Sequence, residues 1–375
     1  MPKTSHIGKV VLLGLYTLFF LSCKDTSTRF ELMKPSTTGV VFSNELSYTE
    51  AFNPYTYRNF YNGAGVALGD INNDGLIDIY FTGNLVDNAL YLNRGGFTFE
   101  EIAETAGVAC KNIWSSGATF VDINQDGWLD LYVCKSGMPG GENRHNELFI
   151  NQKDNTFKEA SAEYGLNITG LSVQAAFFDY DLDGDLDCYL LNNSMRSVGA
   201  YDLIENQRNI PDTEGNRLLE NRNGHFVNVS QEAGIYSSKI GFGLGITLSD
   251  FNNDLWPDIF ISNDFFEKDY LYLNNQKGGF EELGDRYFNA TSMGSMGADA
   301  ADIDNDLQTD LMVTEMLPER LSRKKLKASY ESWDKHQLAK NKGYGNQFPR
   351  NVLQRNMGAE TFAEISRIAG IDGSE

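Results

Sequence analysis

Short apolar stretches alternate along the chain with polar segments rich in Asp, Asn and Gly, and the alternation repeats five times. Before each acidic segment stands an apolar stretch such as "GVALGD" or "GATFVD", and after it a β-rich one such as "LIDIYFTG" or "WLDLYVC". A second pair of strand-like runs follows, as in "ALYLNRGGFTFEEI" and "ELFINQKDNTFKEA". Each unit therefore predicts four short strands, with the first hairpin closed by the acidic segment and the second by an Asn/Gly-rich turn.

The period of the repeat predicts the architecture. The acidic segments begin 52, 57, 71 and 52 residues apart, and an insert at about residues 194–215 accounts for the longest spacing. Four strands per unit, repeated radially, are typical of a β-propeller, so we expect an all-β fold of four-stranded blades. A β-solenoid is the alternative; its coils are usually shorter, and a closed ring protects strand edges better.

The acidic segments share one pattern of oxygen donors. Numbered as loops 1 to 5, they are "DINNDGLID" (70–78), "DINQDGWLD" (122–130), "DYDLDGDLD" (179–187), "DFNNDLWPD" (250–258) and "DIDNDLQTD" (302–310). Positions 1, 3, 5 and 9 carry Asp or Asn. Ca²⁺ takes six to eight oxygens from carboxylates, amides and backbone carbonyls. The pattern therefore predicts up to five calcium sites, although Asp, Asn and Gly are also the commonest turn residues and a plain polar turn is the alternative.

The predicted ligands come from the same positions in each loop. The side-chain ligands are Asp70, Asn72, Asp74, Asp78, Asp122, Asn124, Asp126, Asp130, Asp179, Asp181, Asp183, Asp187, Asp250, Asn252, Asp254, Asp258, Asp302, Asp304, Asp306 and Asp310. The ligands at position 7, through backbone carbonyls, are Leu76, Trp128, Asp185, Trp256 and Gln308. Position 6 is glycine in loops 1 to 3, which permits the positive φ of a sharp turn. Leu255 and Leu307 replace it in loops 4 and 5, where left-handed geometry costs about 1–2 kcal/mol, so these two sites are the weaker predictions.

With their flanks, the loops resemble a known repeat. The opening "TYRNFYNGAGVALGDINNDGLIDIYFTGN" and the recurring "ETAGV", "AEYGL", "QEAGI" and "RIAGI" are similar to FG-GAP/VCBS repeats, the calcium-loop blades of integrin α-subunit propellers and many bacterial surface proteins. The resemblance covers about residues 39–371 and implies a propeller, usually of seven blades, with calcium in the blade hairpins. Only five loops are present, and the ASPIC/UnbV domain that often ends the bacterial group does not follow. We therefore expect 39–375 to be part of a truncated seven-bladed ring, with residues 38–44 completing a last blade.

The N-terminal residues predict export. The apolar run from Val10 to Leu21 is too short to span a bilayer and fits a signal-peptide core. The "FLSC" that ends at Cys23 resembles a bacterial lipobox, which implies a lipoprotein signal peptide at 1–22, lipidation of Cys23 and a tether at 23–38. An ordinary signal peptide is the alternative. We expect an outer-membrane lipoprotein facing the periplasm or the cell surface, attached to the membrane through its lipid anchor only.

Composition narrows the possible partners. The 375 residues are 41% hydrophobic and carry a formal net charge of −21, so the chain lacks the clustered cations that nucleic-acid binding needs. Beyond Cys23, the odd number Cys110, Cys134 and Cys188 predicts no disulfide framework, with a Cys110–Cys134 bridge as the alternative. An insert at about 317–350, "LPERLSRKKLKASYESWDKHQLAKNKGYGNQFPR", predicts a helix with a basic face, either a solvated decoration or a partner-binding surface.

No pattern of catalytic residues accompanies the loops. The four histidines are scattered, and the chain has no GxSxG, HExxH or P-loop motif. We expect a calcium-stabilised binding module that recognises an extracellular or periplasmic glycan or protein. Trp128 and Trp256, at the same position of two loops, are either exposed aromatic platforms or packed against neighbouring loops. The alternative function is a carbohydrate-active hydrolase or lyase that uses channel-lining carboxylates.

Overall fold

The computed structural model of the chain describes residues 30–136, 145–193, 203–208, 215–238, 240–265, 267–327 and 332–374. The expected signal peptide at 1–22, the lipidated Cys23, the first part of the tether and most of the insert at 194–215 lie outside the described residues. The predictions made for these segments therefore stay predictions.

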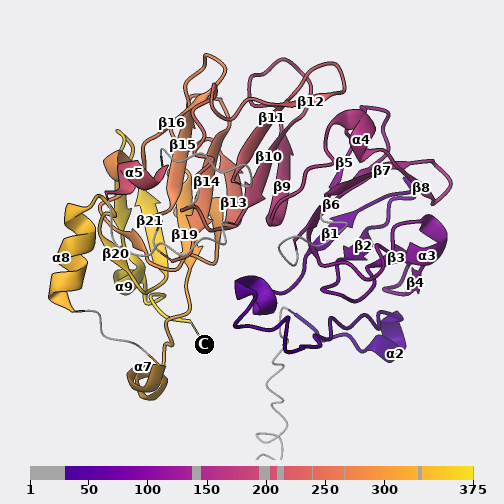
Figure 1. Cartoon of the computed structure of the whole chain (residues 1–375), viewed down its shortest axis with the longest axis horizontal. Helices are drawn as coiled ribbons and strands as arrows, with labels where there is room; N and C mark the ends of the chain where they lie inside the picture. The colour runs from indigo at the N-terminus through magenta and orange to yellow at the C-terminus, as the bar shows by residue number, and fades with distance from the viewer. Residues whose placement is uncertain are drawn as a thin grey trace, which may run out of the picture.

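Five four-stranded antiparallel sheets make up the fold, each with its strands in sequence order (Figure 1). We call them blades 1 to 5. Their strands are β1 Val66–Gly69, β2 Asp78–Phe81, β3 Ala89–Asn93 and β4 Phe99–Glu101; β5 Ser115–Val121, β6 Asp130–Lys135, β7 Glu147–Asn151 and β8 Phe157–Glu159; β9 Ser172–Phe178, β10 Asp187–Asn192, β11 Arg217–Asn221 and β12 Phe226–Asn228; β13 Gly243–Ser249, β14 Asp258–Asn263, β15 Tyr270–Asn274 and β16 Phe280–Glu282; β18 Gly297–Ala301, β19 Asp310–Thr314, β21 Val352–Asn356 and β22 Phe362–Glu364. The predicted all-β fold with four strands per repeat is confirmed.

Short helices connect and decorate the blades. They are α2 Pro35–Thr38, η1 Arg58–Tyr61, α3 Ala103–Ala106, α4 Ser161–Tyr164, α5 Ile204–Arg208, α6 Gly284–Tyr287, α7 Leu321–Lys327, α8 Trp333–Asn341 and α9 Ser366–Ala369, and a small parallel pair joins β17 Thr291–Ser292 to β20 Gln347–Phe348. Within the described ranges, none of these helices has the length and apolar content needed to cross a bilayer.

The core lies between the blades rather than inside any one of them. Every residue of β6, β10 and β14 is buried, because successive side chains point to opposite faces and both faces are covered. Tyr80 and Leu131 pack between blades 1 and 2, Leu148 and Leu190 between blades 2 and 3, and the other two interfaces are filled in the same way. Each blade therefore depends on its neighbours for a complete core.

The first strands of successive blades stand side by side around a common centre, in the order β1, β5, β9, β13, β18 (Figure 1). Their backbones approach closely at two glycines: a Cβ on Gly65 would lie 2.6 Å from the Ser116 carbonyl oxygen, and one on Gly117 would lie 2.4 Å from that of Val173. In the part of the chain that the structure describes, the blades form an arc that does not close, so the complete ring stays a prediction.

A glycine link joins blade 1 to 2, blade 2 to 3 and blade 3 to 4, whereas the turn between blades 4 and 5 ends at Phe288 with a φ of −108°. The turn after the fourth strand ends at Gly107, Gly165 or Gly234, each with a positive φ, and a Cβ there would lie within 3.4 Å of a carbonyl oxygen at the start of the next blade's fourth strand. Residues other than glycine are therefore disfavoured at these positions for two reasons: the positive φ strains an L-amino acid, and its Cβ would crowd the carbonyl oxygen.

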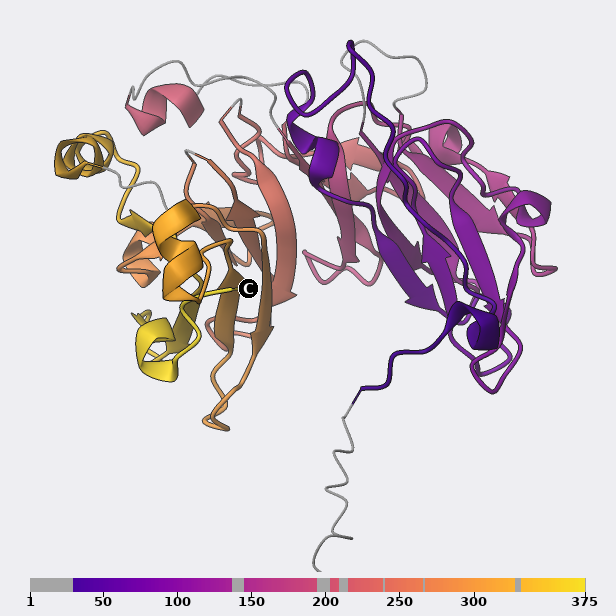
Figure 2. The ribbon, with the colours of Figure 1, turned by 90° about the horizontal axis from the view of Figure 1, so that it is seen from below.

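The N-terminal segment repeats this link ahead of blade 1. Helix α2 ends at Gly39, whose φ is 81°, and a Cβ there would lie 2.6 Å from the Phe99 carbonyl oxygen. Two residues on, the Val41 N–H donates to the Tyr91 hydroxyl over 3.1 Å, as Tyr236 does to Tyr272 in blade 4. Residues 38–44, expected as an outer strand, are instead the end of a helical turn and an extended segment along blade 1 (Figure 2).

The insert at 317–350 forms two helices, α7 and α8, where one was expected. Leu326 and Trp333 are largely exposed, so the apolar positions of the predicted helix do not pack into the core. The end of the insert is anchored by Tyr344, which is buried against Ile204 of α5. Cys110, Cys134 and Cys188 are all free, as expected, and the alternative bridge is not formed.

Candidate metal centre

All five acidic loops have one backbone conformation, organised by the aspartate at position 1. In loop 3 the Asp179 carboxylate accepts the N–H of Asp183 at 3.1 Å and the N–H of Gly184 at 3.0 Å. The equivalent pairs occur in the other four loops. The position 5 carboxylate then accepts the N–H of position 7 in every loop. Local hydrogen bonds thus fold the loop around its own carboxylates.

The turn at position 6 forms with or without glycine. Gly75, Gly127 and Gly184 have positive φ values, and Leu255 and Leu307 adopt the same geometry at 69° and 68°. Loops 4 and 5 therefore present the same loop backbone as loops 1 to 3, at the cost of placing leucine in the left-handed region. The presence of glycine does not separate the five loops by shape.

Position 9 begins the second strand and is buried in every loop, at Asp78, Asp130, Asp187, Asp258 and Asp310. One oxygen accepts the N–H of position 2, and the other accepts the N–H of an asparagine at the end of the third strand, over 2.7 to 2.8 Å. Burial raises the pKa of Asp187 and of Asp258 to about 7 and that of Asp130 to about 6. The hydrogen bonds hold these carboxylates in place but supply no positive charge to neutralise their ionised form.

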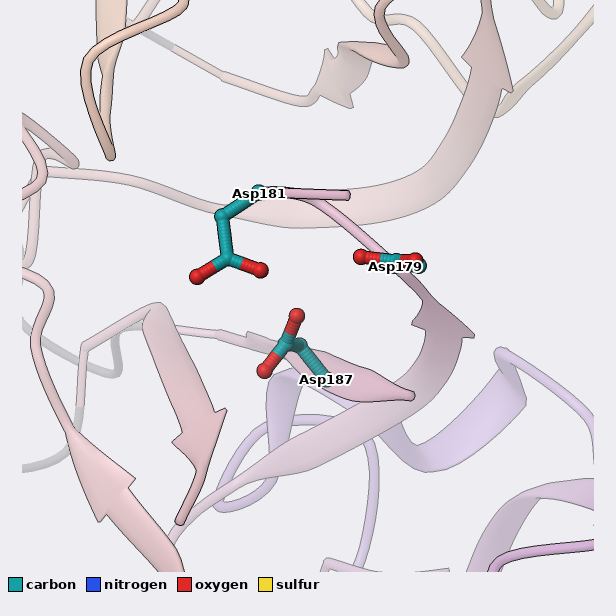
Figure 3. Close-up of side chains that lie close together, drawn as sticks. All are labelled: Asp179, Asp181 and Asp187. Atoms are coloured by element: carbon teal, nitrogen blue, oxygen red, sulfur yellow. The ribbon is translucent and has the colours of Figure 1, made fainter. Parts of the chain in front are cut away.

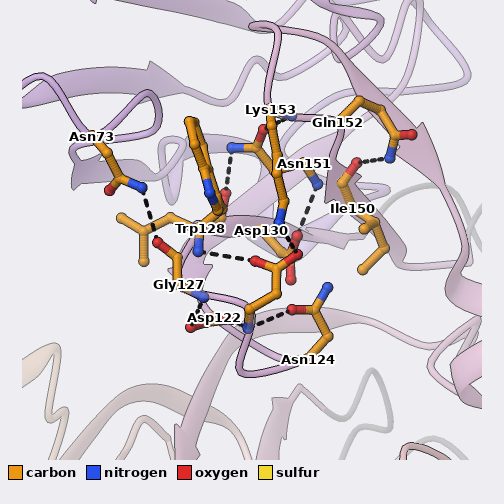
Figure 4. A network of polar contacts seen from close by, with 12 residues as sticks. Asn73, Asp122, Asn124, Gly127, Trp128, Asp130, Ile150, Asn151, Gln152 and Lys153 are labelled. Carbon is orange, nitrogen blue, oxygen red and sulfur yellow. Dashed lines mark hydrogen bonds and ion pairs between the residues drawn. The ribbon is translucent and has the colours of Figure 1, made fainter.

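The third-strand asparagines are the residues that our reading of the sequence missed. They are Asn93, Asn151, Asn221, Asn274 and Asn356. Besides binding Asp130 at position 9 (Figure 4), Asn151 donates from Nδ2 to the Ile71 carbonyl of loop 1 over 2.8 Å. Asn274 and Asn356 reach back to the preceding loop in the same way. The signal was an asparagine in each predicted third strand, four or five residues after its start.

A second set of contacts links the loops along the rim. Asn73 donates to the Gly127 carbonyl and Gln125 to that of Gly184, both over 3.0 Å, and Asn253 donates to that of Leu307 over 3.1 Å. All three donors sit at position 4. Loop 3 carries Leu182 there, which has no side-chain donor, so this series is interrupted between loops 3 and 4.

Loop 3 concentrates the most acidity. Asp179, Asp181 and Asp187 each place a carboxylate oxygen within 4.8 Å of the other two, and the side chains converge in Figure 3. One buried oxygen of Asp181 and one of Asp185 have no hydrogen-bond partner. Burial, followed by repulsion from the Asp183 carboxylate, raises the pKa of both. Glu220, on the third strand, contributes further repulsion. Among the residues that the structure describes, no cation pairs with the five loop 3 aspartates, although Glu220 itself is paired with Arg222 at 2.7 Å.

Loop 5 has the same triad but not the same surroundings. Asp302, Asp304 and Asp310 also place oxygens within 4.8 Å of one another. Here Arg355 forms an ion pair with Asp304 at 2.5 Å and approaches Asp306 at 3.8 Å. Arg355 precedes the third-strand asparagine and so occupies in blade 5 the place that Glu220 occupies in blade 3.

Loops 1, 2 and 4 have asparagine at position 3, and its amide oxygen accepts the N–H of position 5. In loop 2, Lys153 pairs with Asp126 at 3.2 Å and lies 5.9 Å from the centre of the Trp128 ring (Figure 4). Trp128 and Trp256 are both half-buried, so neither is a fully exposed platform, and packing against a neighbouring loop stays a prediction. The position 7 carbonyls stay predicted ligands.

In chemical terms, each loop gathers carboxylate oxygens, with amide oxygens in loops 1, 2 and 4, that accept hydrogen bonds mainly from the loop backbone. Loops 2 and 5 also receive a cation, from Lys153 and Arg355, and in loop 4 Gln276 donates to Asp254. Such oxygen-only sets suit hard divalent cations, with Ca²⁺ favoured by many ligands in flexible geometry. The donors fit this ion best in loop 3, because two of its buried oxygens have no other partner.

Comparison with known families agrees with this repeat. The family model described as an FG-GAP-like repeat matches residues 70–133 and 250–313. Each match begins at position 1 of an acidic loop and ends in the second strand of the following blade, which is β6 for the first match and β19 for the second. The chain thus contains FG-GAP-like repeats of the β-propeller type, as the resemblance implied.

Curated relatives include longer animal proteins. Human cartilage acidic protein 1 is 27% identical over 205 residues, covering 54% of this chain and 28% of that protein. Integrin alpha-8 of Gallus gallus is 26% identical over 178 residues, covering 43% of this chain and 17% of that protein. The matched part is therefore less than a third of either relative.

Solved structures with some likeness include AofleA of Arthrobotrys oligospora, as a triple arginine mutant, with a TM-score of 0.42 and 11% identity over 81% of this chain and 74% of that one. A lectin of Agrocybe aegerita, solved for its recognition of non-reducing terminal N-acetylglucosamine, has a TM-score of 0.40 and 15% identity over 79% and 63%. These scores are too low to support an argument about ligands.

Proposed function

We propose that this chain of FG-GAP-like repeats is a calcium-binding module that is anchored in the bacterial envelope and recognises a glycan or a protein. Calcium would be held in the blade hairpins, with loop 3 as the strongest site. The blades would then present a rigid surface to the partner.

The observation that carries the calcium proposal is the uncompensated acidity of loop 3. Buried oxygens of Asp181 and Asp185 have no hydrogen-bond partner, and three further carboxylates surround them. Leaving a charged oxygen buried and unpaired is costly, so native proteins pair such groups or bind a metal with them. A bound divalent cation would accept these lone pairs and lower the repulsion at once.

Calcium stoichiometry and stability test the proposal together. We expect native mass spectrometry to show several bound Ca²⁺ ions, EDTA to lower the melting temperature, and Ca²⁺ to restore it through mass action. Mg²⁺ should restore it poorly, because it demands tight octahedral geometry and sheds water reluctantly. A wild-type count of no calcium ions would refute the repeated-site proposal.

A lipid anchor is the second element of the proposal. It rests on the "FLSC" at residues 20–23 and on the apolar run before it. We expect Cys23→Ala to release the protein from the membrane fraction of a host that processes lipoproteins, with Cys110→Ala as the matched cysteine control. A Cys23→Ala protein that still sediments with outer membranes would contradict the anchor.

Recognition is tested by binding. We expect the calcium-loaded protein to bind a subset of glycans on an array or a protein of the same envelope, and EDTA treatment to weaken this binding because the blades lose rigidity. Release of reducing ends from a polysaccharide panel, with and without EDTA, would instead favour the alternative of a carbohydrate-active enzyme.

A further inference from the structure

A pocket of about 250 Å³ opens at the end of the first strands that lies opposite the acidic loops. Its walls come from the beginnings of β1, β5, β9 and β13, at Val66, Ser116, Val173 and Leu244, and from the segment 57–65 that crosses above them. Loop 2 begins four residues beyond Ala118 on the same strand, which places it roughly 13 Å away at the usual strand rise. The pocket is thus separate from the proposed calcium sites.

The pocket is built by one irregularity that recurs in three blades. The pairing register shifts between Ser115 and Ala118 in β5, opposite Leu191 and Asn192 in β9, and between Gly243 and Gly245 in β13. β-Bulges re-aim side chains and bend the strand that carries them. The displaced residues, among them Gly117, Val173 and Leu244, are the ones that line the pocket.

The lining is polar and carries no charge among its described residues. It contains the hydroxyls of Ser116, Ser136 and Ser172, each already hydrogen-bonded within the protein but with a lone pair left to accept a further bond, and the amides of Asn59 and Gln174. Because the chain carries a net charge of −21, a pocket whose described lining residues are all uncharged differs from the rest of the surface. An ionised ligand would find no counter-charge among the described lining residues, and a fully apolar one would leave the Asn59 amide oxygen unpaired.

One lining residue points directly to a missing partner. Asn59 is 4% exposed, and its Oδ1 is buried without a hydrogen bond. An amide oxygen in this position is left to accept a hydrogen bond from whatever fills the pocket. Beside it, Tyr57 and Trp114 pack with ring centres 5.1 Å apart and hold one wall rigid.

From this geometry we propose that the pocket binds a single neutral, hydroxylated ring, namely one uncharged monosaccharide unit of a glycan. Its volume is below the roughly 300–1,000 Å³ of sites for larger ligands, which favours one ring over an oligosaccharide. Hydroxyls of such a ring would donate to the Asn59 oxygen and exchange hydrogen bonds with the serines. The inference rests on the glycan-recognition part of the proposed function and names its subsite.

The test measures binding of neutral methyl glycosides of glucose, galactose, N-acetylglucosamine and fucose to the calcium-loaded full chain. Glucuronic acid and glucosamine serve as charged comparisons, and saturation-transfer NMR and titration calorimetry give the readout. We expect at least one neutral glycoside to bind and both charged sugars to bind at least tenfold more weakly. Preferred binding of a charged sugar would overturn the proposal.

Two pocket variants localise the binding. Asn59→Leu removes the unpaired amide at similar volume, and Ala64→Trp fills the exposed mouth; both should weaken binding at least tenfold and leave the calcium count unchanged. Ala162→Trp, an exposed alanine on α4 outside the pocket, is the matched control and should bind normally. If Asn59→Leu does not fold, Ala64→Trp alone decides.

The outcomes separate this inference from the proposed function. If glycans bind on the array but neither pocket variant weakens them, the pocket is wrong and glycan recognition stands. If the wild type binds no glycan at all, glycan recognition fails and the pocket assignment falls with it.

Discussion

Blades 3 and 5 carry the same triad of carboxylates in the same loop, yet their surroundings have opposite charge. In blade 3 the residue before the third-strand asparagine is Glu220, which adds repulsion to Asp181 and Asp185. In blade 5 the equivalent residue is Arg355, which pairs with Asp304. One loop therefore keeps its negative charge for an external cation, whereas the other is already partly neutralised by the chain.

The difference between blades 3 and 5 shows that the acidic motif alone does not determine which loop should bind calcium most tightly. The motif fixes the loop backbone, including the left-handed turn at Leu307. The side chain that reaches the loop from a strand elsewhere in the sequence sets the charge that a cation meets. The side chains of Arg355 and Asp304 are 40% and 30% exposed, so solvent screens this pair and its contribution is about 0–1 kcal/mol, comparable to that of the turn residue.

The largest expected difference between loops 3 and 5 follows from removing the aspartate at position 5. We expect Asp183→Ala to remove one bound calcium ion and to cost about 2–3 kcal/mol of calcium-dependent stability at saturating calcium. The matched Asp306→Ala loses the same local hydrogen bonds but leaves a loop already paired with Arg355, so its calcium-dependent loss should be smaller. Native mass spectrometry and melts with and without calcium measure both. Equal losses would break the comparison.

Exchanging the flanking charges should come next in size. We expect Glu220→Arg to weaken calcium binding at loop 3 by roughly tenfold or more, and Arg355→Glu to strengthen it at loop 5 by a similar factor, about 1.4 kcal/mol each way. Leucine, which occupies this place in blades 1 and 4 as Leu92 and Leu273, supplies neutral controls in Glu220→Leu and Arg355→Leu. Calcium titrations that do not respond to these exchanges would show that the flanking residue is irrelevant.

Blades 3 and 5 also show which features could be predicted from the sequence. The repeat length, the strands and the acidic loops could be read from local patterns, because hairpin pairing and loop conformation are decided within a few residues. The roles of Glu220 and Arg355 could not, since they act on loops that end 33 and 45 residues earlier in the chain (187 to 220, 310 to 355). The N-terminal segment was misjudged for a different reason: its helical turn is closed by local hydrogen bonds, such as that from the Gly39 N–H to the Pro35 carbonyl, and only Val41 beyond it is held by Tyr91.

Protonation gives a smaller effect that depends on calcium. Burial raises the pKa of Asp187 to about 7, above the value near 3.9 of an unfolded chain. Its stabilising contribution is complete below about pH 4 and is lost as the pH rises through about 7, so in EDTA the melting temperature should fall by several degrees between pH 5 and pH 8. Calcium should reduce this fall, because the ion favours the ionised carboxylate.

Two variants assign the pH dependence. In Asp187→Asn the calcium-sensitive part of the fall should shrink. Asp269, also buried with a pKa raised to about 7, lies outside the loops and accepts from Ser295, so Asp269→Asn should remove only a calcium-insensitive part. The opposite assignment would contradict the role of Asp187. Melts from pH 5 to pH 8, with calcium or EDTA, provide the measurement.

The smallest expected effect concerns the turn itself. Leu307→Gly should stabilise the fold by about 1 kcal/mol or less, because glycine adopts the positive φ freely and the unfolded chain gains entropy in part compensation. Gly184→Ala, at a φ of 97°, should destabilise loop 3 by a similar amount. A large gain in calcium affinity from Leu307→Gly would show that turn geometry, rather than Arg355, limits loop 5.

Leu182, which has no side-chain donor, interrupts the series of position 4 hydrogen bonds between loops 3 and 4. Asn73 and Gln125 join loops 1, 2 and 3 through donated amides, and Asn253 joins loops 4 and 5. In a linear array with nearest-neighbour coupling, cooperativity passes only through joined units. Loops 3 and 4 lack this link and are joined instead through Asn274, which donates to Asp258 of loop 4 and to the Tyr180 carbonyl of loop 3. We therefore expect calcium binding to be coupled more strongly within loops 1 to 3 and within loops 4 and 5 than across the boundary between them.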